Sequence, residues 1–347
     1  MICKMEGLSL RAVSSHIPEK EIPIDSYVDF FGEKKVKRLK RSTGVEFVHV
    51  VSPEETASDL CVKAAENLLE KEKISRDSID GIVFVSISPD YRAPGTAGIL
   101  QDRLGLSENV VAVDLTFGCS GYIYGLYEAG MLIKAGGCKR VLLCAGDTQS
   151  LLVNEKDRSM KMLVGDAGTA SIIEAGQDSW EFYFKTAGKG FQSLIIPAGG
   201  CRHPSTEATR QERVDADGNI RRDVDLYMNG GEVMKFALSE VPVAVDTLCE
   251  KVGLEKEQIN LFAFHQPNKL ILDYLKNSMG IPDEKAPVGL RYVGNTASAS
   301  IPVLLTTLAA NGYDYTEVKD VIACGFGIGL SIGAVHVNLS NTQFYSE

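Results

Sequence analysis

The 347-residue chain lacks three features that would each define a class of protein. It has no excess of positive charge, and its net charge of −10 argues against a nucleic-acid-binding protein. It has no apolar run of roughly 18 residues, so no membrane-spanning helix is expected. The N-terminal residues lack the long apolar stretch of a secretory signal, so we expect a cytoplasmic location.

The sequence also lacks the common signatures of metal and cofactor binding. It contains no metal-ligand cluster, no phosphate-binding Walker loop and no dinucleotide fingerprint in a strand–turn–helix setting. We therefore expect no metal and no tightly bound cofactor. The eight cysteines are scattered without a CxxC motif, which argues against a disulfide framework. Cys144 and Cys324 lie in apolar runs and are predicted to be core residues.

What the chain does contain is an internal duplication. The first copy predicts strands at 79–86, 109–119 and 139–147 and a helix at 120–137. The second predicts a strand at 259–267, a segment leading to a turn at 286–295, a helix at 296–312 and a strand at 319–329. Cys119 lies 17 residues before Gly136, and Asn295 lies 17 residues before Gly312. We therefore divide the chain into homologous halves, 1–177 and 178–347.

Each half alternates buried strands with helices, which predicts α/β halves with largely parallel sheets. The helices expected at 120–137 and 296–312 are apolar and rich in small residues on nearly every face. A helix that is apolar all round is a buried helix. The two are therefore predicted to pack together at the centre of the molecule, between the two sheets.

Cys119 is the candidate nucleophile. It lies in TFGCSGYIYG, where a strand ends, a glycine makes a turn and a buried helix begins. Unpaired N–H groups and the positive end of the helix dipole favour a thiolate there. A thiolate in such a place can form a thioester with an acyl group.

Two residues of the second half are its candidate partners. Asn295 occupies the position equivalent to Cys119, so the pseudo-symmetry brings the two helix starts together. His265 follows the strand expected at 259–267, at the sheet edge where α/β proteins gather ligands. Taken singly, the histidine is a common structural residue and the asparagine a common helix cap; together with Cys119 they form a catalytic set.

Two polar segments interrupt the pattern. Residues 198–235 are predicted to form a long surface excursion, which is typical of a lid or an entry loop. Residues 32–44 form a basic run, which is either a solvated helix face or a contact for a phosphate or an acidic partner.

These residues lie in six motifs: AVDLTFGCSGYIYGL, LVGDAGTASII, MNGGEVMKFA, HQPN, GNTASASIP and ACGFGIGLSIGA. In that order they resemble the β-ketoacyl-acyl-carrier-protein (ACP) synthase III family over nearly the whole chain. The resemblance implies a thiolase-like five-layer αβαβα sandwich of two pseudo-symmetric halves, and a homodimer. It also implies a triad of Cys119, His265 and Asn295, and an oxyanion hole made by the backbone N–H groups of Cys119 and of Ile328 in the Gly327–Gly329 turn.

The activity implied is an acyltransferase reaction in two steps, a 3-oxoacyl-ACP synthase III reaction in lipid metabolism. Cys119 takes an acyl group from an acyl-CoA or acyl-ACP, and malonyl-ACP then loses CO2 to give a carbanion that attacks the acyl group. Neutral His265 and the amide of Asn295 are suitable donors for the enolate oxygen. Thiolases carry histidine at the position of Asn295 and use a second cysteine as a base, so Asn295 argues against a thiolase.

The sequence departs from the family at the primer site. Arg38 and Ser42 stand where members that take a CoA primer have tryptophan and arginine, Leu270 stands where they have arginine, and Ala93 stands where a phenylalanine often closes the acyl pocket. These changes favour a roomier pocket, a longer acyl group or a carrier-bound donor. The candidate contacts for substrate or acyl carrier protein are Lys37, Arg38, Arg41, Asn268, Lys269 and Ala93, with Arg221 and Arg222 as further candidates.

Two alternatives remain open. One is an enzyme of the same fold that moves the acyl group to an oxygen, nitrogen or sulfur acceptor, or condenses without decarboxylation; the second case needs a base, for which Asp90 is the candidate, although an aspartate after proline is more often a turn residue. The other is a scaffold without activity, which has no need of Cys119, His265 and Asn295 together.

Overall fold

The structure is a computed structural model, and it describes residues 1–216 and 218–347. The first half contains β1 (Ile2–His16), β2 (Glu21–Pro23), α1 (Val28–Phe31), α2 (Glu33–Thr43), β3 (Phe47–His49), α3 (Ala57–Glu72), β4 (Gly81–Val85), α4 (Thr96–Arg103), β5 (Val111–Leu115), α5 (Gly121–Lys134), β6 (Arg140–Asp147), α6 (Arg158–Lys161) and β7 (Ala167–Thr186). The second contains β8 (Leu194–Ile195), β9 (Arg213–Val214), β10 (Ile220–Arg221), β11 (Tyr227–Met228), α7 (Gly230–Val252), β12 (Leu261–Phe264), α8 (Lys269–Met279), α9 (Ser300–Ala310), β13 (Val321–Gly327), β14 (Ser331–Val337) and β15 (Gln343–Ser346).

Nine of the described strands form one connected sheet in the order β12-β13-β14-β7-β6-β4-β5, with β1 paired to both β7 and β15. The long strands β1 and β7 join the two halves, because each pairs along its length with strands of both. Parallel pairing is confirmed for β4 with β5 and β6 and for β12 with β13. The expectation of largely parallel sheets is wrong for β6–β7, β13–β14 and β14–β7, which are antiparallel. Residue 177, the expected boundary, lies inside β7.

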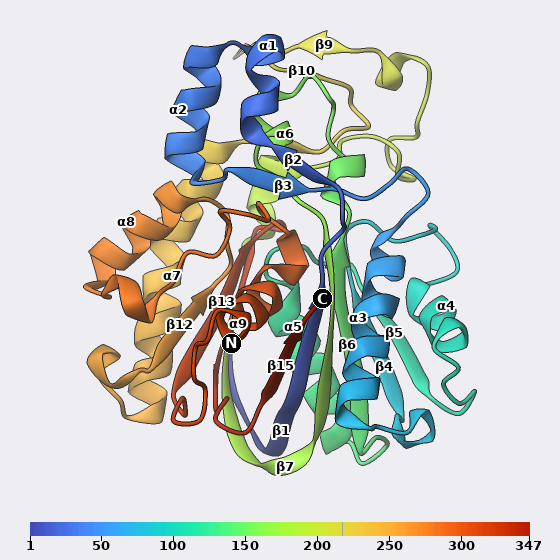
Figure 1. Ribbon diagram of the computed structural model, residues 1–347, viewed down its shortest axis with the longest axis vertical. Coiled ribbons are helices and arrows are strands. Elements are labelled where there is room, and N and C mark those ends of the chain that lie inside the picture. The colour runs from blue at the N-terminus through green and yellow to red at the C-terminus, as the bar shows by residue number, and fades with distance from the viewer. Residues whose placement is uncertain (217) are drawn as a thin grey trace.

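The layers follow the predicted order. In Figure 1, α3 and α4 cover one side of the molecule and α7 and α8 the other, with α5 and α9 between them. Helix α5 packs on β4 and β6 of the first half and on β13 and β14 of the second. The duplicated register also appears in the backbone, since Gly136 and Gly312 follow the two central helices with φ of 81° and 87°. The prediction of two buried central helices is confirmed.

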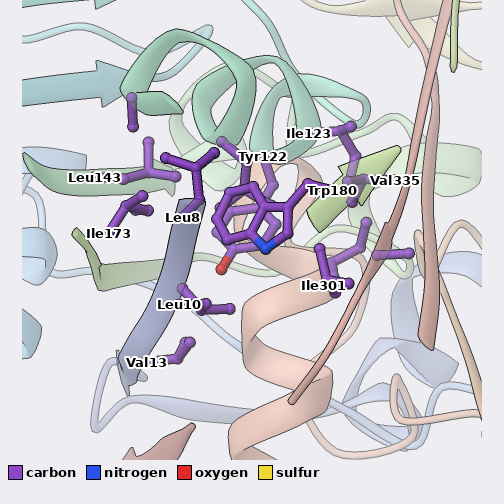
Figure 2. Close-up of a cluster of buried hydrophobic side chains, with 14 of the residues drawn as sticks. Leu8, Leu10, Val13, Tyr122, Ile123, Leu143, Ile173, Trp180, Ile301 and Val335 are labelled. Atoms are coloured by element: carbon purple, nitrogen blue, oxygen red, sulfur yellow. The ribbon is translucent and has the colours of Figure 1, made fainter. Parts of the chain in front are cut away.

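A single core cluster holds the central layer together. Figure 2 shows the indole ring of Trp180, from β7, beside Tyr122 and Ile123 of α5 and Ile301 of α9. Trp180 is fully buried and is the only tryptophan of the chain. Its burial between elements of both halves makes its fluorescence a reporter of the packing of the whole core.

The polar excursion lies at one end of the molecule, at the end that also carries α1 and α2 (Figure 1). Its base is the β8–β11 pair, and within it β9 pairs with β10. No helix in the part of the chain that the structure describes is both long enough and apolar enough to cross a lipid bilayer.

Candidate active site

Cys119 lies in the turn between β5 and α5. The N–H of Gly121, the first residue of α5, donates to the carbonyl of Gly118 at 2.7 Å and closes the turn, so Cys119 lies two residues before the helix begins. Cys119 retains 9% of its surface, whereas Cys144 and Cys324 are completely buried in the core, as predicted. The nucleophile candidate is thus the one of these three thiols that is not fully enclosed.

The Gly327–Gly329 turn at the end of β13 approaches the sulfur closely. A Cβ atom placed on Gly327 would lie 3.0 Å from the sulfur and 2.9 Å from Cβ of Cys119, and the φ of Gly327 is 154°. Only glycine fits a backbone approach of this kind. The backbone N–H groups of Ile328 and of Cys119 itself favour the negative form of the sulfur and act to lower its pKa.

Burial nevertheless outweighs these two donors. Burial and, second to it, the nearby carboxylate of Asp147 raise the pKa of Cys119 to about 12, although the N–H groups of Ile328 and Cys119 act in the opposite direction. A thiolate buried away from water loses its hydration, and two donors do not replace it. Cys119 is therefore a protonated thiol near pH 7. Burial raises its pKa more than the start of α5 lowers it.

His265 follows β12, and its backbone N–H donates to the carbonyl of Cys324 on β13 at 2.8 Å. Its imidazole ring meets the ring of Phe326 edge-on at a centroid distance of 5.5 Å. Only 1% of its surface is exposed, and burial lowers the pKa of His265 to about 3. The ring is consequently neutral near pH 7, as the predicted donor role requires.

Asn295 is fixed by contacts with the LVGDAGTASII segment. Its backbone N–H donates to the carbonyl of Leu163 at 2.9 Å, and its carbonyl accepts from the N–H of Gly165 at 3.0 Å. A Cβ atom on Gly165 would lie 1.9 Å from the carbonyl oxygen of Val293, so this contact requires glycine. The side-chain Oδ1 accepts from the N–H of Ala297 at 3.0 Å, which orients the amide and leaves its Nδ2 as the donor for an incoming oxygen.

The structure brings the predicted residues of both halves to one place. Cys119 and His265 are both held against β13, at Gly327 and Cys324 respectively. The turn that follows Asn295 reaches the start of α5, where a Cβ atom on Gly121 would lie 3.6 Å from Cβ of Ser298. This is the arrangement that the duplication predicts for the two helix starts.

Two functional candidates were missed from the sequence. Ser300, the first residue of α9, contacts the ring of His265, and the buried carboxylate of Asp147, the last residue of β6, lies behind Cys119. Ser300 lies in the motif GNTASASIP, and Asp147 ends the apolar strand expected at 139–147. Neither residue belongs to a spacing pattern that would indicate its role. Asp147 is detectable only as a charge at the end of a fully buried strand.

The candidate contacts for substrate or acyl carrier protein do not converge on the sulfur. Lys37, Arg38 and Arg41 are exposed on α2, whereas Lys40 of the same helix bonds Asp25 at 2.6 Å. Asn268 is the N-cap of α8 and accepts from the N–H of Ile271, and Lys269 pairs with Asp273. Ala93 lies in an exposed loop after β4. Their proposed roles stay predictions.

Three other candidates are engaged elsewhere. Arg221 is 11% exposed and bonds Asp157 and Asp215, so its guanidinium is engaged within the fold. Arg222 forms a two-pronged contact with Asp225 but stays 42% exposed. The carboxylate of Asp90 accepts from the hydroxyl of Ser58 on α3 at 2.7 Å. This favours the structural role for Asp90 over that of a base, because its bonded oxygen faces the outer helix layer.

Comparisons with known proteins identify the family of the chain. The family model described as 3-oxoacyl-[acyl-carrier-protein (ACP)] synthase III matches residues 113–188, and the model of its C-terminal part matches residues 249–339. The chain is 31% identical to the β-ketoacyl-[acyl-carrier-protein] synthase III of Campylobacter concisus, over 98% of this chain and 99% of that protein.

Solved structures show the same likeness in three dimensions. A 3-oxoacyl-(acyl-carrier protein) synthase from Burkholderia xenovorans LB400 is 34% identical, with a TM-score of 0.91 over 99% of both chains. A 3-oxoacyl-(acyl-carrier-protein) synthase III is 36% identical, with a TM-score of 0.91 over 95% of this chain and 99% of that chain. The fold is therefore that of the thiolase-like acyl-transferring enzymes. Within this class, the chain belongs to the 3-oxoacyl-ACP synthase III family.

Proposed function

We propose that this enzyme joins an acyl group to a malonyl-derived unit in two half-reactions at Cys119. In the first, the sulfur attacks the carbonyl of an acyl-CoA or acyl-ACP, and the thiol proton leaves with the released CoA or ACP thiol. In the second, malonyl-ACP loses CO2, and the resulting enolate carbon attacks the acyl-Cys119 thioester to form the new carbon–carbon bond and release the sulfur. No tightly bound cofactor takes part.

The positions of the donors support this sequence of steps. The N–H groups of Cys119 and Ile328 lower the pKa of the sulfur, which supports their role as donors to the oxyanion that forms on an acyl group bound there. Neutral His265 and Nδ2 of Asn295 are uncharged donors, which suits an enolate oxygen. Decarboxylation generates the carbanion, so no side chain has to remove a proton from carbon.

The observation that carries the proposal is that Cys119 and His265 both contact β13, at Gly327 and Cys324 respectively. The turn that follows Asn295 contacts the start of α5. The test is mass spectrometry of the intact enzyme with acyl-CoA and acyl-ACP donors, followed by measurement of CO2 release from malonyl-ACP. The condensation is supported by an acyl adduct on Cys119 that disappears as CO2 is released. Loading without CO2 release would instead indicate transfer to another acceptor, and Cys119→Ala is the control for loading.

The acyl group is expected to be apolar. Ile328 packs against a separate hydrophobic cluster that includes Val153 of the loop after β6, Leu194 of β8, Val233 of α7 and Leu330. These segments come from both halves of the chain. A set of acyl-CoA donors of increasing length, compared by their loading rates, tests this preference.

The exposed cations of α2 suit an acidic carrier protein. Lys37, Arg38 and Arg41 lie on an otherwise acidic chain, and α2 packs beside α8, the helix that follows His265. Charges of this kind act mainly on the encounter rate and weaken with salt. Charge reversal in the double variant Lys37→Glu and Arg41→Glu is expected to raise KM for malonyl-ACP about tenfold without changing kcat. Lys319→Glu, at the opposite end of β13 from Gly327, is the matched control.

The homodimer is supported by the edge of the sheet. Among the described residues, β5 pairs with β4 on one side and with no strand on the other. Its sequence VAVDL is apolar except for one aspartate, yet Val111 is 42% exposed. A bare apolar edge strand is a ready site for pairing with a second copy. Val113→Arg is expected to convert a dimer to a monomer in light scattering; a wild-type monomer would contradict the proposal.

A further inference from the structure

Asp147, the last residue of β6, is a completely buried carboxylate that the two half-reactions above do not use. Its Oδ1 accepts from the N–H of Ile87 at 2.8 Å and from the hydroxyl of Ser86 at 3.0 Å. Its Oδ2 accepts from the N–H of Ser298 at 3.0 Å and from the hydroxyl of Ser298 at 2.6 Å. A buried carboxylate with this many donors is an ordered and costly feature, which invites a functional explanation.

The two sets of donors come from different halves of the chain. Ser86 and Ile87 follow β4 of the first half, and the side chain of Ile87 would lie 3.5 Å from a Cβ atom on Gly118, the residue before Cys119. Ser298 belongs to the turn of the second half that begins at Asn295. Asp147 therefore ties the loop beside the nucleophile to the loop that carries the carboxamide.

The link to Asn295 is short. Oδ1 of Asn295 bonds the N–H of Ala297, and the next N–H along the chain, that of Ser298, bonds Asp147. Ala297 has a φ of 45°, a left-handed conformation that a residue with a Cβ atom adopts at a cost. Such a turn persists only when its surroundings hold it. Leu163 and Gly165 of the first half hold the backbone of Asn295, and the two bonds to Ser298 hold the other end of the same turn.

We propose that Asp147 is a positioning residue of the condensation: through Ser298 it holds the Asn295 turn in register, and it places a fixed negative charge behind the sulfur of Cys119. The inference rests on the condensation proposed above. The charge disfavours a free thiolate in the empty site, so the sulfur becomes nucleophilic only as the bound thioester and the N–H groups of Cys119 and Ile328 share the developing charge.

The electrostatics agree with this role. Two influences raise the pKa of Cys119: burial, which is the larger, and the carboxylate of Asp147. The other titratable groups around the sulfur are uncharged near pH 7, since burial lowers the pKa of His265 to about 3 and raises that of Cys324. Burial raises the pKa of Asp147 itself to about 6, opposed by the bonds from Ser298, Ile87 and Ser86. Cys61 of α3, whose pKa burial raises, also faces Asp147 as a neutral thiol.

Asp147→Asn tests both parts of the proposal. The amide removes the charge and keeps one acceptor, so its NH2 group must face the donors of either Ser298 or Ile87. We expect the alkylation of Cys119 by iodoacetamide at pH 8 to become about tenfold faster, the effect of one pKa unit. We also expect CO2 release from malonyl-ACP to fall at least tenfold, while loading of the acyl group on Cys119 is retained.

Two further variants separate these effects from a general loss of structure. Asp166→Asn removes another buried carboxylate, which bonds Ser150 and the N–H of Val51, and it should leave the alkylation rate of Cys119 unchanged. Ser298→Ala keeps the charge and one of the two bonds to Asp147, so it should slow CO2 release without changing alkylation. This second variant also decides the positioning role if Asp147→Asn fails to fold.

The proposal is overturned if Asp147→Asn leaves either rate at the wild-type value, if Asp166→Asn reproduces both changes, or if Ser298→Ala leaves CO2 release unchanged. The alkylation of Cys119 by iodoacetamide is measured without an acyl substrate, so it does not depend on the proposed condensation. A wild-type enzyme that neither loads acyl groups nor releases CO2 contradicts the condensation, while the effect of Asp147 on the thiol is still measured in the same samples.

Discussion

The hydroxyl oxygen of Ser300 lies 2.7 Å from Nδ1 of His265, and this contact sets which ring nitrogen faces the substrate. Burial keeps the ring neutral by lowering the pKa of His265 to about 3, so one nitrogen carries a proton and the other does not. When the Ser300 hydroxyl donates to Nδ1, the proton of the imidazole is on Nε2. The ring then presents an N–H donor to the enolate oxygen.

Ser300→Ala removes this contact and leaves the tautomer and the ring plane unfixed. We expect CO2 release from malonyl-ACP to fall about 10- to 100-fold, because catalysis by a positioned donor is sensitive to small misplacements. Acyl loading on Cys119, followed by mass spectrometry, should remain near the wild-type rate. Thr306→Ala is the matched control: it removes a hydroxyl of the same helix that bonds Ser15 at 2.7 Å. An equal loss of CO2 release in both variants would contradict the assignment.

The protonation of Cys119 gives a second prediction. With the pKa of Cys119 raised to about 12 by burial and by Asp147, the thiolate fraction increases tenfold for each pH unit from 7 to 9. Alkylation of the Cys119 peptide by iodoacetamide should rise by the same factor, without a plateau. Cys201, which is exposed on the excursion, serves as an internal reference in the same digest. A plateau below pH 8 would show that the resting thiol is activated after all.

Much of this arrangement could be predicted from the sequence, because it depends on local pattern. The 17-residue register placed Cys119 and Asn295 at equivalent helix starts, and the φ values of Gly136 and Gly312 agree with it. The sequence did not predict that β1 and β7 run through both halves. The burial pattern changes along each of these long strands, so each appears in the sequence as several shorter segments. Asp147 and Ser300 were missed because their roles depend on partners more than 100 and 30 residues away, respectively.

The sequence also does not show which of its charged residues form ion pairs within the fold. Arg221 and Arg222 stand out in a polar segment as candidate carrier contacts, yet the structure pairs them with Asp157 and Asp225. A run of charges in a sequence does not tell which of them are neutralised within the fold, because the acidic partner of Arg221 is 64 residues away. By contrast, the helical spacing of Lys37, Arg38 and Arg41 is enough to predict that they are exposed on α2.

The buried imidazole predicts how stability depends on pH. The pKa of His265 is about 3 in the folded protein and about 6.5 in the unfolded chain, so the unfolded state binds more protons between these values. Stability is therefore fully present above pH 6.5 and decreases as the pH falls toward 3. His265→Phe removes this dependence, and the loss of unfolding free energy between pH 6.5 and 4 should be about 3 kcal/mol smaller than in the wild type. Urea unfolding followed by Trp180 fluorescence measures both losses, and equal losses would contradict the neutral buried ring.

The close approach of Gly327 to Cys119 predicts a variant that blocks the first half-reaction. In Gly327→Ala the new methyl group would lie 3.0 Å from the sulfur, so the turn must move and carry the N–H of Ile328 away from the oxyanion. We expect acyl loading to fall by about 100-fold or more, the effect of losing one such donor. Gly312→Ala is the control, because its φ of 87° is also unfavourable for alanine but no atom lies within 4 Å of the added carbon. It should lower stability by about 1 kcal/mol and leave loading intact.

The ion pair between Arg221 and Asp157 predicts where the excursion is anchored. The side chain of Asp157 is 1% exposed and that of Arg221 is 11% exposed, and Asp157 also caps α6 by accepting from the N–H groups of Ser159 and Met160. Arg221→Ala leaves a buried carboxylate without its cation, which typically costs about 3 kcal/mol or more. Arg213→Ala breaks an exposed pair with Asp223 and should cost less than about 1 kcal/mol. Urea unfolding gives the two values, and limited proteolysis shows whether the excursion is cut first in Arg221→Ala. Similar stabilities for the two variants would mean that the excursion is held by its β8–β11 base rather than by this ion pair.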